Sequence, residues 1–164
     1  MRTLFLVLIL LVFPSFAFGA NLEDVIEATC RISGGGGTGT GCIIAENDTH
    51  FAVITNAHVV GKVSELKLEF WNDGKALKPR TGRVVARWYH DKAFRDIAIV
   101  EIPKAGFRDA SIVPLYSDHN PERSGLSPVV YSVGCPNGSW PTAFRGRVIR
   151  EDVGTVDFVP APFG

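Results

Sequence analysis

The stretch Ile54-Thr55-Asn56-Ala57-His58-Val59-Val60 places a histidine directly after an apolar run that is typical of a buried strand. Farther along the chain, Arg95-Asp96-Ile97-Ala98-Ile99-Val100 places a carboxylate at the start of a second apolar run. A histidine and an aspartate at the ends of strands are more often a structural hydrogen-bonded pair than a catalytic one. Their interpretation therefore depends on the strands and motifs that surround them.

The runs on both sides of these stretches predict an all-β fold built from short strands. The run 65–71 is the clearest, because apolar side chains at positions 66, 68 and 70 alternate with charged ones. Six strands are expected in the first part of the chain, at 25–33, 40–45, 51–55, 65–71, 83–89 and 97–102, and three more at 129–134, 142–150 and 153–159. Short strands at even spacing favour a sandwich or a barrel.

The composition agrees with a globular domain and excludes several classes of protein. The 164 residues suffice for one domain or two small halves, and 46% hydrophobic with 21% charged residues excludes bulk disorder. The 17 Lys and Arg residues balance 17 Asp and Glu residues. Without a basic block, neither nucleic acid nor an anionic membrane surface is an expected partner. The 17 glycines and 10 prolines suit a turn-rich β fold.

The first 19 residues are predicted to be a secretory signal peptide. Arg2 precedes an unbroken apolar run at 4–12, Pro14 interrupts the run, and Ala17 and Gly19 are small residues at the positions that a signal peptidase reads. The mature protein is therefore expected to be exported, either to the periplasm or as a secreted protein. The alternative is an uncleaved membrane anchor, since the apolar run is only slightly shorter than a membrane span. Pro14 and the small residues disfavour that alternative.

The glycine run and the remaining histidines have simpler structural interpretations than ligand binding. Residues 34–39 contain G-x-G-x-x-G, but a dinucleotide loop leads into a helix, whereas here an apolar strand follows, so a hairpin is expected. His50, His90 and His119 lie in turn-like contexts and are expected at the surface. No H-E-x-x-H or C-x-x-C occurs, so neither a metal site nor a cofactor is expected.

Four blocks of the sequence together resemble the trypsin-like serine proteases, and most closely the bacterial HtrA type. The histidine block at 54–60 is similar to T-N-x-H-V-V of that family, and the blocks at 39–44, 95–100 and 130–138 resemble its other motifs in the same order. The resemblance implies a chymotrypsin-type double antiparallel β-barrel with the active site in the cleft between the barrels. It divides the mature chain into a first barrel at 20–116, a linker at 117–128 and an incomplete second barrel at 129–164.

The resemblance also implies a serine endopeptidase that hydrolyses protein or peptide substrates through a His/Asp/Ser triad. His58 is the expected base, and Asp96 is the expected acid that orients it. The family's nucleophile lies in G-x-S-G-G. Gly164 matches the first glycine of this block and is an expected oxyanion-hole donor, so the serine is expected beyond Gly164. The 164 residues are therefore expected to be a fragment that is inactive by itself.

Two other functions are compatible with the same blocks. One is a non-catalytic binding module on the protease fold, and the other is a cysteine protease with Cys at the nucleophile position. Cys135 itself is a poor candidate for that nucleophile because it aligns with a different block. A hairpin centred on Gly35-Gly36-Gly37 would place Cys30 opposite Cys42 and allow a disulfide in an exported protein, whereas Cys135 is expected to be unpaired.

Overall fold

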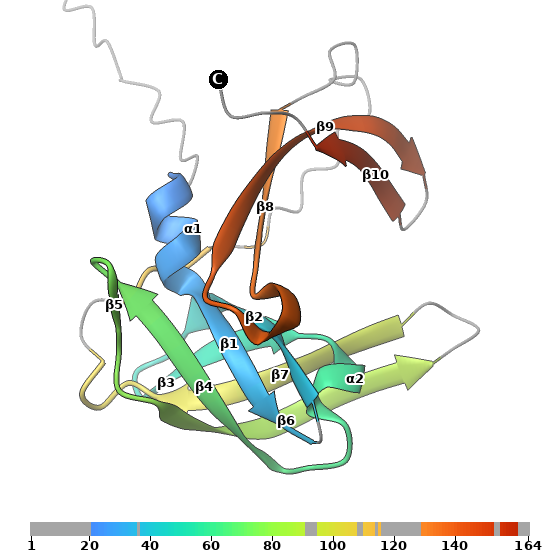
Figure 1. The fold of residues 1–164 in the computed structure, drawn as a ribbon. Helices are drawn as coiled ribbons and strands as arrows, with labels where there is room; N and C mark the ends of the chain where they lie inside the picture. The colour runs from blue at the N-terminus through green and yellow to red at the C-terminus, as the bar shows by residue number, and fades with distance from the viewer. Residues whose placement is uncertain are drawn as a thin grey trace, which may run out of the picture.

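The computed structural model describes residues 21–35, 37–90, 95–107, 110–113, 115, 129–152 and 155–160. Within these ranges the chain forms two antiparallel sheets and two short α-helices (Figure 1). The predicted signal peptide at 1–19, the predicted linker at 117–128, His119 and Gly164 lie outside the described residues. None of the helices in the described part of the chain is long and apolar enough to cross a membrane.

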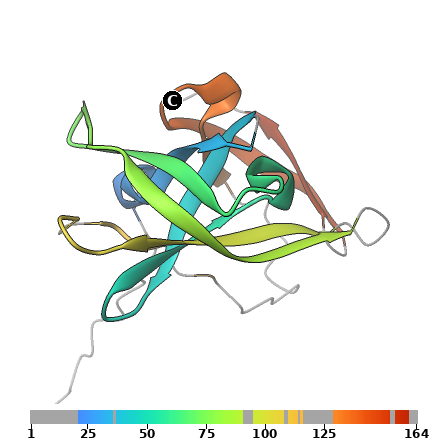
Figure 2. The same cartoon turned by 90° about the horizontal axis from the view of Figure 1, so that it is seen from below.

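Six strands close into a barrel, as the sequence predicts (Figure 2). Their order around the barrel is β1 (Thr29–Gly34), β2 (Gly37–Glu46), β3 (His50–Thr55), β7 (Arg95–Pro103), β6 (Arg80–His90) and β4 (Glu65–Asn72). The antiparallel pairing of β1 with β4 closes the ring. The two-residue strand β5 (Lys75–Ala76) pairs with the end of β4 as a hairpin.

The side chains that fill the barrel come from alternate positions of its strands, because successive residues of a strand point to opposite faces. In β4, Leu66, Leu68 and Phe70 are buried while Lys67 is exposed. Large side chains from the neighbouring strands complete this core, among them Ile32, Ile43, Val53, Val100 and Ile102. Burial of this apolar surface stabilises the strands on which the candidate site is built.

The first expected strand begins later than predicted, because residues 22–28 are helical. Helix α1 (Leu22–Ala28) precedes β1, which starts at Thr29. The Asn21 side chain accepts a hydrogen bond from the backbone N–H of Asp24 at 2.9 Å, and the Asp24 carboxylate accepts one from the backbone N–H of Asn21 at 3.3 Å. This reciprocal capping box stabilises a helix start. It overrides the strand preference of the apolar residues that follow.

The glycine run forms the predicted hairpin between β1 and β2, but its register differs by one residue from the predicted one. Cys30 pairs with Gly41, and Cys42 pairs with Thr29. The side chains of Cys30 and Cys42 therefore point to opposite faces of the sheet, and both thiols are free. The predicted direct pairing of Cys30 with Cys42 is wrong for this reason, and the disulfide that it would allow is not formed. Cys135 is unpaired, as expected.

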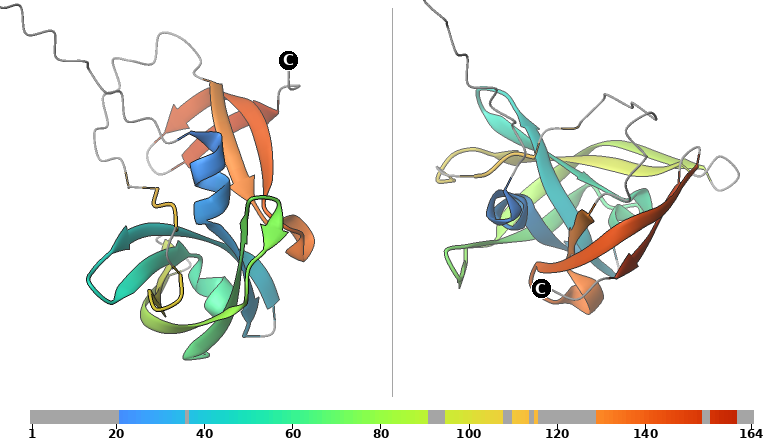
Figure 3. Two further views of the ribbon diagram at one scale, coloured as in Figure 1. Left: turned by 90° about the vertical axis from the view of Figure 1, so that its left-hand side faces the viewer. Right: turned by 90° about the horizontal axis from the view of Figure 1, so that it is seen from above.

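The second sheet contains three strands at the positions that the sequence predicts. They are β8 (Val129–Gly134), β9 (Thr142–Asp152) and β10 (Thr155–Pro160), with β9 in the middle. A short 3-10 turn, η3 (Pro136–Gly138), connects β8 to β9. Figure 3 shows this sheet beside the barrel, with α1 next to both. The second sheet therefore contacts the barrel directly, through β8 against β1 and β2, as well as through α1 and the η3 turn.

Candidate active site

His58 lies on a single helical turn that directly follows a central strand of the barrel. Strand β3 ends at Thr55, and helix α2 (Ala57–Val60) begins two residues later. Ala57, Val59 and Val60 are buried against the barrel. The His58 side chain points away from this packing and is 62% exposed. The apolar residues of the block thus anchor the turn and leave the imidazole accessible.

Asp96 is the second residue of β7, and its side chain meets His58 at two points. The His58 ring nitrogen Nδ1 lies 2.5 Å from Asp96 Oδ2. The backbone N–H of His58 donates to the other carboxylate oxygen, Oδ1, at 2.9 Å. The expected proximity of these two side chains is confirmed, and the contact uses the ring nitrogen that leaves Nε2 on the far side of the ring.

The carboxyl group of Asp96 has a pKa below its usual value. Burial by itself acts to raise this pKa, but hydrogen bonds from the ring and the backbone N–H of His58, with smaller contributions from the His58 charge and the Ala57 backbone, outweigh it. A ring nitrogen that contacts an ionised carboxylate donates, so Nδ1 carries a proton and Nε2 is the nitrogen that accepts one. A general base needs this arrangement.

Asn56 holds the strand that carries Asp96. Its side-chain Nδ2 donates to the backbone carbonyl of Asp96 at 3.1 Å. The preceding residue, Thr55, is buried and donates from Oγ1 to the carbonyl of Thr40 on β2 at 2.7 Å. The sequence by itself predicts no role for Asn56. The signal that marks it is its place in the histidine block, two residues before His58.

The stretch that contains both site residues matches a known family. The sequence profile of the family described as trypsin-like peptidase domain matches residues 39–158. The chain belongs to this family. The resemblance found in the histidine and aspartate blocks is thereby confirmed, and the closed barrel with a second sheet beside it is the fold of a trypsin-like peptidase domain with an incomplete second barrel.

Solved structures of similar fold are proteases of low sequence identity. The Rv3671c protease in its inactive form is 24% identical, with a TM-score of 0.53 over 76% of this chain and 53% of that chain. A mutant of Rv3671c from M. tuberculosis H37Rv is 23% identical, with a TM-score of 0.56 over 84% of this chain and 58% of that one. The MamO protease domain from Magnetospirillum magneticum in its apo form is 19% identical, with a TM-score of 0.51 over 77% of this chain and 62% of that one.

These matches support the fold of the peptidase domain. The chain spans 53 to 62% of the length of the solved chains it matches. No curated protein matches the sequence significantly.

Cys135 does not have the environment of a reactive thiol in this peptidase domain. It lies between β8 and η3 and is 4% exposed. Burial raises the pKa of the Cys135 thiol, and this effect outweighs the hydrogen bond with Thr40 and the charge of Arg31, which both lower it. A nucleophilic cysteine needs a lowered pKa and access to solvent. The environment of Cys135 therefore disfavours its role as the nucleophile.

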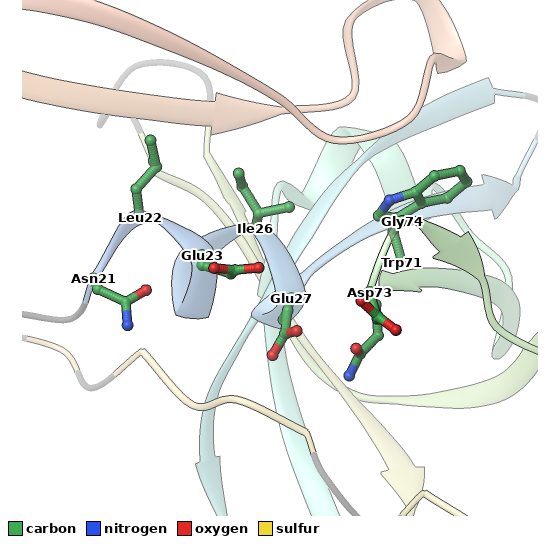
Figure 4. A pocket seen from close by; sticks show the side chains of 9 residues that line it. Asn21, Leu22, Glu23, Ile26, Glu27, Trp71, Asp73 and Gly74 are labelled. Carbon is green, nitrogen blue, oxygen red and sulfur yellow. The ribbon is translucent and has the colours of Figure 1, made fainter.

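A groove on the peptidase domain lies between α1 and the end of β4 (Figure 4). Its lining consists of Asn21, Leu22, Glu23, Ile26, Glu27, Trp71, Asn72, Asp73 and Gly74. Neither His58 nor Asp96 contributes to it. The candidate active site is therefore the exposed imidazole and its carboxylate, and the groove is a separate feature.

Proposed function

We propose that this protein is an exported serine endopeptidase in which His58 is the general base and Asp96 orients it. One observation carries this proposal. Both carboxylate oxygens of Asp96 accept hydrogen bonds from His58, one from its ring and one from its backbone. This geometry in a chain of the trypsin-like peptidase family supports a role in peptide-bond hydrolysis.

The proposed reaction uses Nε2 of His58. In the first step, Nε2 accepts the proton of a serine hydroxyl as the serine oxygen attacks the scissile carbonyl. In the second step, the protonated ring gives this proton to the leaving amine as the C–N bond breaks, which leaves an acyl-serine ester. Water activated by the same Nε2 then hydrolyses this ester and frees the serine. Asp96 keeps the proton on Nδ1 and stabilises the positive charge that the ring acquires between the two steps. The reaction requires no metal or cofactor.

The proposed nucleophile is a serine in a G-x-S-G-G sequence whose first glycine is Gly164. The run 159–164 reads Val-Pro-Ala-Pro-Phe-Gly and resembles the sequence that leads into this block. Backbone N–H groups of the same block would form the oxyanion hole. Protein and peptide chains are the proposed substrates, because an acyl-transfer site of this kind acts on amide bonds.

The test of this function is covalent labelling together with substrate cleavage. The protein is expressed from its complete gene and incubated with a serine-directed fluorophosphonate probe and with casein. Labelling and cleavage are expected, and His58→Ala should lower both by roughly 10³-fold or more. His50→Ala is the matched control, because His50 lies at the other end of β3 and contacts Thr49 through Nδ1.

Two outcomes would contradict the proposal. Cleavage that His58→Ala leaves unchanged would show that the base lies elsewhere. Absence of both labelling and cleavage in the native protein would favour a binding module on the same fold. Export is tested separately by sequencing the N-terminus of the protein recovered from outside the cytoplasm, which is expected to begin at Ala20.

A further inference from the structure

Arg31 on β1 forms a partly buried ion pair on the outer face of the barrel. It pairs directly with Glu69 across the β1–β4 ladder. Its Nε donates to Glu69 Oε2 at 3.0 Å, and its Nη2 lies 2.9 Å from the same oxygen. The side chains of Arg31 and Glu69 are only 23% and 12% exposed. Two contacts and partial burial fix the direction of the guanidinium group.

The same guanidinium group also contacts the connection between β8 and β9 of the second sheet. Its Nη1 donates to the backbone carbonyl of Gly138 at 2.7 Å. Its central carbon lies 4.3 Å from the ring centroid of Trp140, which in turn packs on Trp71 of β4 with centroids 4.8 Å apart. Arg31 therefore joins the second half of residues 135–140, the stretch that contains the η3 turn, to the first barrel. We call residues 135–140 the η3 segment.

The η3 segment is also linked to the strands that carry the candidate site. The backbone N–H of Cys135 donates to Thr40 Oγ1 at 2.8 Å. Thr40 accepts the hydrogen bond of Thr55 through its carbonyl at 2.7 Å, and Thr55 lies at the end of β3, three residues before His58. A hydrogen-bonded path thus runs from the η3 segment to the strand that presents the base.

Close packing brings the segment to the β1–β2 hairpin as well. A Cβ atom on Gly138 would lie 3.3 Å from Thr38 Oγ1. On the neighbouring Gly39, a Cβ atom would lie 2.5 Å from Val59 Cγ2. Val59 is the residue after His58 on helix α2. Strand β2 therefore lies between the η3 segment and the helix that carries His58.

We propose that Arg31 is a positioning residue that holds the η3 segment, and with it the second sheet, in a fixed place relative to His58. This role rests on the proposed function, in which the base lies on the first barrel and the nucleophile follows the second sheet. A displacement of one sheet relative to the other would lengthen the distance between base and nucleophile. Displacements of about 1 Å can lower turnover by roughly 10²-fold.

Only an arginine has the geometry for these simultaneous contacts. Its planar group donates in one direction to Glu69, in another to Gly138, and presents its face to Trp140. A lysine keeps the positive charge but provides a single ammonium group without the planar fork. Arg31→Lys therefore separates the positioning role from a simple requirement for charge.

The test compares Arg31→Lys with Arg83→Lys in the protein expressed from its complete gene. Arg83 is a matched control, because its Nη2 also donates to a cross-strand glutamate, Glu101, at 2.9 Å, but its side chain is 71% exposed and bonds no residue of the second sheet in the described part of the chain. For Arg31→Lys, kcat on a peptide substrate should fall about tenfold or more while KM changes less than threefold. For Arg83→Lys, both should stay within twofold. Equal kcat values for the two variants would overturn the proposal.

A second readout does not depend on activity. The near-ultraviolet circular dichroism of the paired indoles of Trp71 and Trp140 should weaken in Arg31→Lys and stay unchanged in Arg83→Lys. An unchanged spectrum in Arg31→Lys would show that Arg31 does not hold the η3 segment and would overturn the proposal. If the native protein has no turnover at all, the proposed function fails and the positioning role fails with it, whereas the spectrum still reports whether the contact exists.

Discussion

His58 donates to both carboxylate oxygens of Asp96, from its backbone N–H to Oδ1 at 2.9 Å and from ring Nδ1 to Oδ2 at 2.5 Å. The first contact fixes the backbone of the helical turn to β7, and the second fixes the rotation of the ring. The imidazole is thus oriented relative to its own main chain. This rigidity compensates for the exposure of the ring, which has little packing of its own to hold it.

Replacing Asp96 with asparagine should disable the base without disturbing the barrel. The amide of Asp96→Asn has one acceptor oxygen, so it cannot accept from both the backbone N–H and Nδ1, and it favours the wrong ring tautomer. We expect kcat to fall by roughly 10³- to 10⁴-fold. Steady-state hydrolysis of a peptide substrate measures this loss. Asp73→Asn is the control, because Asp73 lies in a turn with φ of 47°, which asparagine adopts readily. A loss of equal size in the control would refute the assignment.

The Asn56 side chain should support turnover through the backbone of Asp96. Asn56→Ala removes the donor to the Asp96 carbonyl, so the start of β7 gains freedom near the His58–Asp96 pair. We expect kcat to fall about tenfold and the free energy of unfolding to fall by about 1 kcal/mol, the net value of one hydrogen bond. Kinetics and urea unfolding measure the two effects. An unchanged kcat would mean that His58 alone positions Asp96.

The barrel and the His58–Asp96 pair were accessible from the sequence because each has a local signature. Alternating burial at Leu66, Leu68 and Phe70 marks a strand with one face in the core. The histidine and aspartate blocks each combine an apolar strand with a polar residue at its end, and the family resemblance joins them although 38 positions separate them.

Other features depend on interactions that local patterns do not contain. Val25 and Ile26 favour strand by propensity, yet the Asn21–Asp24 capping box makes them helical. Several residues of the glycine run can form the turn equally well, so the sequence does not define which of them lies at the centre of the hairpin. The observed β1–β2 register therefore differs by one residue from the predicted one. The hydrogen bond from Arg31 to Gly138 joins residues 107 positions apart, and no sequence motif indicates it. Only the packing of the second sheet on the barrel brings them together.

A single methyl group added at Gly82 should destabilise the barrel, because the interior has no room for it. A Cβ atom there would lie 2.5 Å from both Leu68 Cδ1 and Val100 Cγ1, which are core side chains. Overpacking of this kind costs about 1–3 kcal/mol. We expect Gly82→Ala to lower the free energy of urea unfolding by that amount and Gly37→Ala, which meets no atom within 4 Å, to change it by much less. Equal stability of the two variants would contradict the packing.

Asp96 should make part of the stability of the protein sensitive to acid. Burial acts to raise the pKa of this carboxyl, but the hydrogen bonds from His58 lower it below its value of about 3.9 in an unfolded chain. A lowered folded-state pKa means that the stabilisation is fully present above pH about 4 and is lost as the pH falls through the lowered pKa. Urea unfolding of the native protein and of Asp96→Asn, from about pH 6 to about pH 2, measures the effect. The stability difference between the native protein and Asp96→Asn should shrink as the pH falls below about 4, so a difference that persists undiminished to about pH 2 would contradict the assignment.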